Sequence, residues 1–196
     1  SRYLRMSKAL QNSGREILFS MSEWGVCNGY KWGENTGATM WRTTLDLTDY
    51  WDRPTEHTNR GNSIKTIFDL QMGLQKYQKP GCYNDPDMLV VGLKGEGYLG
   101  ESLSMRPIKP GCSDIEYRSH MSMWCMLSAP LMIGADISNL DKYNTETLLN
   151  PGIISIDQDP LCKPCILVKT NNGLEYYLKE LVNFKTALMV LNTRDE

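Results

Sequence analysis

The sequence lacks the features that mark nucleic-acid-binding and membrane-spanning proteins. Its 196 residues include two histidines and three phenylalanines, and the formal net charge is −2. Such a balance gives no electrostatic attraction to nucleic acid or to an anionic membrane. No apolar run approaches the roughly 20 residues that span a bilayer. We therefore expect an ordinary globular protein with no nucleic-acid and no membrane partner.

Several motifs with known chemistry are also missing. There is no GxSxG elbow and no P-loop. The six cysteines lack the dense, even spacing of a small disulfide-rich domain. Cys162 and Cys165 form a CxxC, which leaves a zinc site, a disulfide or redox pair, and two incidental thiols open. Zinc would need a second ligand pair, and His57 and His120 lie far from the motif, so we expect no metal.

Helical segments alternate with short apolar runs along most of the chain. The spacing of apolar residues predicts helices at 2–13, 63–75, 114–128 and 145–149. Apolar runs predict strands at 17–19, 41–46, 88–91 and 130–134. This alternation is typical of a parallel α/β fold with strands buried on both faces, either a barrel or a doubly wound sheet. Beyond Pro160, three β-leaning segments without intervening helices predict an antiparallel domain, at 166–169, 175–179 and 187–191.

Candidate functional residues follow the expected strands. In parallel α/β folds, reactive groups gather at the carboxyl ends of the strands. Those positions carry carboxylates, an aromatic side chain, an arginine and a methionine: Glu23, Trp24, Arg42, Asp46, Asp85, Asp87, Met88 and Asp136. Such a rim suits a sugar, and glycoside hydrolysis needs a pair of carboxyl groups. Each group also has a simpler explanation, because an Asp at a strand end is often only a cap or a turn residue.

Longer strings carry a specific family resemblance. FSMSEWG at 19–25, WRTTLD at 41–46 and PGCYNDPDML at 80–89 resemble, in order and spacing, glycoside hydrolase family 27. That family comprises α-galactosidases and α-N-acetylgalactosaminidases. The resemblance implies a (β/α)8 TIM barrel, with strands five to eight in residues 1–160. The start of an antiparallel β-sandwich would then follow in residues 161–196.

The resemblance also implies roles for individual residues. Asp46 matches the general acid/base of the family. Arg42 and Glu23 match residues that contact the sugar near its 2-position. Trp24 and Met88 would line the pocket. Family members need no metal or redox cofactor, so the implied partner is a carbohydrate substrate alone.

The implied activity is retaining hydrolysis of terminal α-linked galactose by double displacement. Glu23, rather than a small residue, favours a free 2-hydroxyl over a 2-acetamido group. Cys27 stands where a pocket residue is expected, which leaves β-L-arabinopyranosidase and α-N-acetylgalactosaminidase specificities open. A non-catalytic carbohydrate-binding relative is a third alternative. The family's nucleophilic Asp has no match, so we expect it shortly before Ser1 and expect this chain alone to be inactive.

Overall fold

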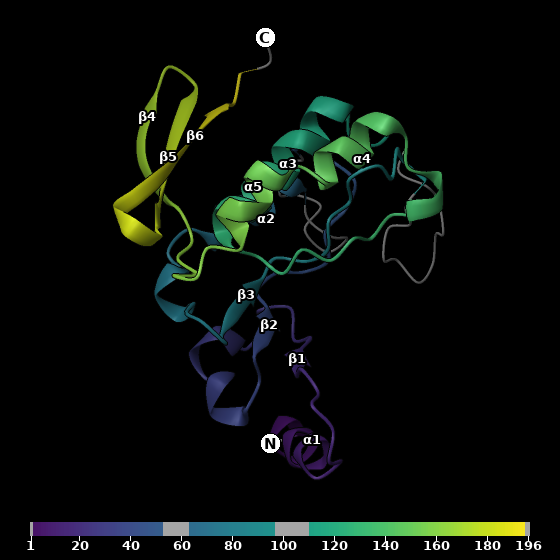
Figure 1. Ribbon diagram of the computed structural model, residues 1–196, viewed down its shortest axis with the longest axis vertical. Helices are drawn as coiled ribbons and strands as arrows, with labels where there is room; N and C mark the ends of the chain where they lie inside the picture. The colour runs from purple at the N-terminus through teal and green to yellow at the C-terminus, as the bar shows by residue number, and fades with distance from the viewer. Residues whose placement is uncertain (1, 53–62, 97–109, 195–196) are drawn as a thin grey trace.

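Three short parallel strands form the first sheet of the protein (Figure 1). The structure, a computed structural model, describes residues 2–52, 63–96 and 110–194. The strands lie in the order β1–β2–β3, with bounds β1 Ser20–Met21, β2 Met40–Arg42 and β3 Tyr83–Asp85. Met40 of β2 pairs with Ser20 of β1 and with Tyr83 of β3. The three strands therefore begin at the same level, and their carboxyl ends share one edge.

A fourth parallel segment follows β3 without forming a full strand. Leu89 and Ile133 form an isolated parallel bridge. The Leu89 N–H donates to the Met132 carbonyl at 2.7 Å, and the Gly134 N–H donates to the Leu89 carbonyl at 2.9 Å. The chain after β3 is thus held beside residues 132–134.

The predicted strand positions were wrong in detail. β1 begins after the apolar run 17–19, β3 lies before 88–91, and β2 covers only the start of 41–46. Burial on both faces holds for consecutive residues of β2 and β3. It fails for two of the predicted apolar runs, because Leu18 is 65% exposed and Ile133 is 45% exposed. An apolar run marks where a strand is favourable, but partners on neighbouring strands decide where pairing occurs. Within the described chain β1 has a partner on one side only, so the residues leading into it stay exposed.

Five α-helices are described, and four of them match predicted ones. They are α1 Arg2–Gln11, α2 Ile64–Gln71, α3 Asp114–Leu127, α4 Lys142–Leu148 and α5 Pro151–Asp157. Short 3-10 helices lie at Gly29–Lys31, Glu34–Thr36, Gln75–Tyr77, Ile137–Asn139 and Val182–Phe184. Ser113 and Glu116 form a capping box at the start of α3, because the Ser113 side chain accepts from Glu116 N–H while the Glu116 carboxylate accepts from Ser113 N–H. Helix α5 was not predicted, although Asn150 caps it and Pro151 occupies its first turn.

The predicted antiparallel segments form a second, three-stranded sheet. Its strands are β4 Ile166–Asn171, β5 Leu174–Leu181 and β6 Lys185–Asn192, in the order β4–β5–β6. Asn172 and Gly173 join β4 to β5 with φ values of 47° and 70°. Two central residues with positive φ are typical of the type I′ hairpin turn that Asn-Gly favours.

One face of this second sheet packs against the helices (Figure 1). Tyr177 of β5 is 1% exposed and meets Phe68 of α2 edge to face, with ring centroids 5.1 Å apart. Lys179 is fully buried, and its Nζ donates to the Cys125 carbonyl at 2.8 Å and to Ser128 Oγ at 2.5 Å. An ammonium group there satisfies the carbonyl end of α3, where the helix dipole favours positive charge. The second sheet therefore shares one apolar core with the helices, whereas Met21 and Trp41 of the first sheet belong to a separate cluster.

Most of the segment 92–112 lies outside the described residues, at 97–109. His57 also lies outside them. Across the described ranges, no helix has the length and apolar character to cross a membrane.

Candidate functional site

Arg42 lies at the centre of a charged cluster at the carboxyl ends of β2 and β3. Its Nη2 is 3.2 Å from Asp46 Oδ1 and 2.7 Å from Asp87 Oδ2. The Arg42 and Asp87 side chains are 11% and 9% exposed, whereas Asp46 is 48% exposed. A buried guanidinium is stable only with compensating charge, which Asp87 supplies. Asp46 is left as the carboxylate of the cluster that solvent or a substrate can reach.

Asp87 also fixes the backbone around this cluster. Its Oδ2 accepts from the Leu47 N–H at 2.8 Å, one residue beyond Asp46, and its Oδ1 accepts from the Met88 N–H at 2.8 Å. Trp124 Nε1 of α3 donates to the Asp87 carbonyl at 2.8 Å. Asp87 has a φ of 93°, a conformation that is rare for a residue with a side chain. The ends of β2 and β3 and the middle of α3 are thus joined through one residue.

Asp85 supports the backbone of Asp87. Its Oδ1 accepts from the Asp87 N–H at 2.8 Å, and the residue is 9% exposed. Burial raises the pKa of Asp85, partly opposed by this hydrogen bond and by the charge of Arg42. The two aspartates of the NDPD string therefore shape the turn after β3, as a turn former would.

Glu23 closes the loop that follows β1. Its Oε2 accepts from the Cys27 N–H at 2.8 Å, and its Oε1 accepts from the Gly29 N–H at 2.7 Å. Each carboxylate oxygen has two lone-pair sites, so both can still accept from a ligand hydroxyl. Trp24 has a positive φ of 56° and is 47% exposed, and Cys27 is an exposed free thiol. The loop presents a carboxylate and an indole ring together.

Gly25 brings this loop against the segment that follows Arg42. Its φ is 74°, and a Cβ placed on it would lie 2.1 Å from the Thr43 carbonyl oxygen. No side chain fits so close an approach, so glycine is required here. The Glu23 loop and the Arg42–Asp46 segment are therefore packed neighbours.

The six residues predicted for the site fall into two groups. Arg42, Asp46 and Met88 are tied together through Asp87, and Met88 is 48% exposed. The other three lie on the neighbouring loop: Glu23, Trp24 and Cys27. Among the described residues, no hydrogen bond or ion pair joins the two groups directly.

The sequence places Asp87 among the strand-end candidates and favours a structural role for it, but it does not predict the ion pair with Arg42. The available signal was a second Asp directly after the NDP turn, which the sequence also allows as a plain turn residue. Asp49 was missed by sequence reasoning, although it stands three residues beyond Asp46. Its carboxylate accepts from the Gly95 and Cys112 N–H groups and so ties the segment after Asp46 to two other parts of the chain.

Neither a metal site nor a disulfide is part of the described site. In the ranges 2–52, 63–96 and 110–194, no group of three His, Cys, Asp or Glu side chains could hold a metal ion. Cys162 and Cys165 are free thiols, and Tyr83 lies within hydrogen-bond reach of the Cys162 sulfur at 3.7 Å.

Comparison with known proteins places this geometry in a family. A family model described as alpha galactosidase A (Melibiase_2) matches residues 1–159. Alpha-galactosidase 2 of Arabidopsis thaliana is 36% identical over 191 residues, which cover 97% of this chain and 41% of that protein. The chain spans about two fifths of the length of the curated relatives that it matches.

Solved structures of α-galactosidases are also similar to this chain. A putative alpha-galactosidase from Bacteroides fragilis superposes with a TM-score of 0.88 at 32% identity, covering 97% of this chain and 38% of that one. An α-galactosidase from Saccharomyces cerevisiae, solved with raffinose, has a TM-score of 0.81 at 25% identity, covering 97% and 43%.

Proposed function

Because this chain belongs to the alpha galactosidase A family, we propose that it forms part of a retaining α-galactosidase with Asp46 as its general acid/base. The carrying observation is the pairing of a half-exposed Asp46 with a buried Arg42, which is itself held by Asp87. This arrangement presents one carboxyl group to a substrate while the surrounding charges stay fixed. A preorganised charged group of this kind costs little reorganisation during reaction.

Asp46 would act twice in the double displacement. In the first step its carboxyl proton passes to the glycosidic oxygen as the bond to the sugar breaks, and an aspartate nucleophile bonds to the anomeric carbon. In the second step Asp46 takes a proton from water, and the water oxygen displaces the nucleophile from the anomeric carbon. The two carboxyl groups must lie about 5–5.5 Å apart for this chemistry. We propose that the nucleophile belongs to a part of the enzyme outside this chain, which would leave the chain alone inactive.

Arg42, Glu23 and Trp24 would hold the sugar. Arg42 Nε is buried and has no hydrogen-bond partner among the described residues, so the guanidinium keeps one donor unused. The Glu23 oxygens retain acceptor capacity for a hydroxyl group. The exposed Trp24 ring can cover an apolar sugar face, while Met88 and Cys27 line the rim. The proposed substrates are terminal α-galactosides, such as the raffinose bound by the Saccharomyces cerevisiae relative.

The same proposal includes the finer organisation of the chain. Residues 1–160 would supply strands five to eight of the (β/α)8 barrel, with the site at their carboxyl ends. Residues 161–196 would begin the C-terminal β-sandwich. The parallel sheet, the Leu89–Ile133 bridge and the antiparallel β4–β6 sheet support this division.

The test is Asp46→Asn in the intact enzyme, assayed on two substrates. An α-galactoside with an alkyl leaving group needs protonation, and we expect kcat/KM on it to fall roughly 10²–10⁴-fold. A dinitrophenyl α-galactoside leaves without a proton, so its first step should be retained far better. Near wild-type turnover of the alkyl galactoside would refute the assignment.

Asp69→Asn is a matched control. Asp69 is 49% exposed and pairs with Lys65 four residues earlier, just as Asp46 is 48% exposed and pairs with Arg42. Asp69 lies on α2, away from the strand ends. We expect both substrates to be hydrolysed at wild-type rates by this variant.

A further inference from the structure

Asp49 is a buried carboxylate with an unusual set of partners. The residue is 2% exposed. Its Oδ2 accepts from the Gly95 N–H at 2.8 Å, and its Oδ1 accepts from the Cys112 N–H at 3.1 Å. The Tyr117 hydroxyl lies 2.9 Å from both oxygens. Among the described residues these donors are all neutral, and they hold the carboxylate by hydrogen bonds.

The backbone approaches the Asp49 carboxylate so closely that a side chain at Gly111 would not fit. Gly111 has a φ of 77°, and a Cβ on it would lie 2.5 Å from Asp49 Oδ2 and 2.3 Å from the Gly95 nitrogen. Burial and the Asp49 charge raise the pKa of Tyr117, so its hydroxyl keeps the proton that it donates. Two chain segments and α3 therefore converge on this one side chain.

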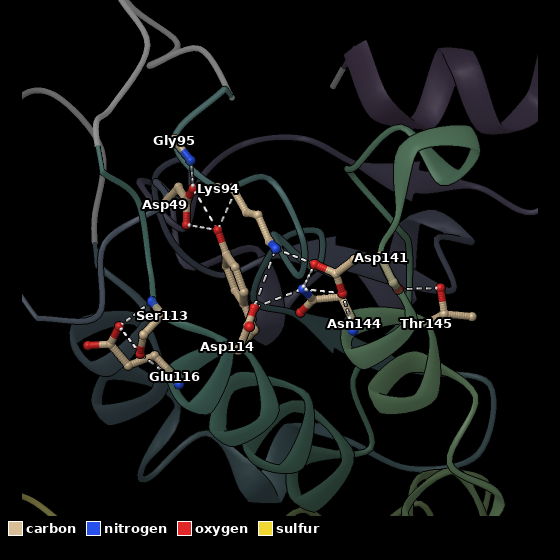
Figure 2. A network of polar contacts seen from close by, with 10 residues as sticks. Asp49, Lys94, Gly95, Ser113, Asp114, Glu116, Asp141, Asn144 and Thr145 are labelled. Atoms are coloured by element: carbon tan, nitrogen blue, oxygen red, sulfur yellow. Dashed lines mark hydrogen bonds and ion pairs between the residues drawn. The ribbon is translucent and has the colours of Figure 1, made fainter.

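The contacts continue from Tyr117 into a larger network. Figure 2 shows Asp49 beside Gly95, with Lys94 reaching toward Asp114 and Asp141. The Lys94 N–H donates to the Tyr117 oxygen at 2.6 Å, while its Nζ pairs with Asp141. Asp49 is the member of this network nearest to Asp46 in sequence, three residues beyond it.

Asp46 itself is held mainly through its neighbours. Its side chain meets Arg42, and the N–H of the next residue, Leu47, donates to Asp87. Asp49 anchors the same segment two residues beyond Leu47. We propose that Asp49 is a positioning residue that fixes the Asp46 carboxyl for proton transfer, an inference that rests on the proposed function. A displacement near 1 Å at a reacting group costs on the order of 10²-fold in rate.

The test compares Asp49→Asn with wild type in the intact enzyme on the same two galactosides. In this variant a side-chain NH2 group replaces one acceptor oxygen and faces a backbone N–H. We expect kcat/KM on the alkyl galactoside to fall roughly 10–10²-fold, with a much smaller loss on the dinitrophenyl galactoside. The ratio of the two values does not depend on the folded fraction. An equal loss on both substrates would show a merely structural role and overturn the proposal.

A double variant separates this proposal from the proposed function. If Asp49 acts through Asp46, Asp49→Asn should cause no further leaving-group selectivity in an Asp46→Asn background. A full, additive change in that background would overturn the positioning role. If Asp46→Asn alone shows no leaving-group dependence, the proposed function fails first, and the positioning role fails with it.

Two further variants serve as a backup if Asp49→Asn misfolds and as a control for the assignment to Asp49. Tyr117→Phe removes one donor to Asp49 and should change the substrate ratio in the same direction, by a few fold. It gives a result even where Asp49→Asn fails to fold, and an unchanged ratio would count against the proposal. Asp141→Asn alters the far end of the network, where Asp141 caps α4. Its ratio should stay at the wild-type value, and a change matching that of Asp49→Asn would overturn the assignment to Asp49.

Discussion

His120 should make the protein less stable as the pH falls. It is fully buried on α3, its Nε2 accepts from the Val90 N–H at 3.1 Å, and its ring meets Trp124 edge to face at 4.1 Å. Nδ1 is buried without a partner among the described residues. Burial lowers the pKa of His120 to about 3. The imidazole therefore stays neutral in the folded protein over the whole range in which a free histidine takes up a proton.

The size of the effect follows from proton linkage. An unfolded histidine has a pKa near 6.5, so below that pH His120 is protonated in the unfolded state but stays neutral in the folded state. Stability is fully present above pH 6.5 and is lost as the pH falls from about 6.5 to about 3. At pH 5 the loss is about 2 kcal/mol, a factor of roughly 30 in the folding equilibrium.

Urea unfolding at pH 7.5 and pH 5 measures this effect, with His120→Gln as the comparison. A glutamine oxygen can accept from the Val90 N–H but cannot be protonated in this range. The variant should lose about 2 kcal/mol less than wild type between the two pH values. Asp157 acts in the opposite direction, because burial raises its pKa to about 6 and the folded state then binds the extra proton. The difference between the two proteins cancels that contribution, and equal losses in both would refute the reasoning.

Three substitutions test other parts of the structure. Asp87→Asn removes the charge that compensates the buried Arg42, and we expect about 3 kcal/mol of destabilisation in thermal or urea unfolding; a loss below ~1 kcal/mol would contradict the buried pair. Gly25→Ala forces a Cβ to 2.1 Å from a carbonyl oxygen and should raise KM, whereas Gly73→Ala, with a φ of 92° and open space around it, should affect stability alone. Ser113→Ala breaks the α3 capping box and should cost about 1 kcal/mol, with galactoside hydrolysis unchanged.

Local signals predicted local structure well. Ser113 and Glu116 specify the start of α3 through contacts three residues apart, and Asn172-Gly173 specifies a hairpin turn through backbone preference. The start of α5 carries equally local signals, because Asn150 is its N-cap and Pro151 occupies its first turn. Strand boundaries were less predictable, because hydrogen bonds to neighbouring strands set them. The apolar run 17–19 therefore lies outside β1.

The sequence by itself determined the family, the α/β rhythm and the residues at the strand ends, because motif order and periodicity are written along the chain. Tertiary structure alone decided how those residues act on one another. Asp87 meets Arg42 across 45 positions, 87 minus 42, and Tyr117 meets Asp49 across 68. Such pairings depend on which segments the fold brings together. A carboxylate in the sequence therefore becomes a half-exposed group at Asp46 or a buried one at Asp49 only through the burial and hydrogen bonds that the fold supplies.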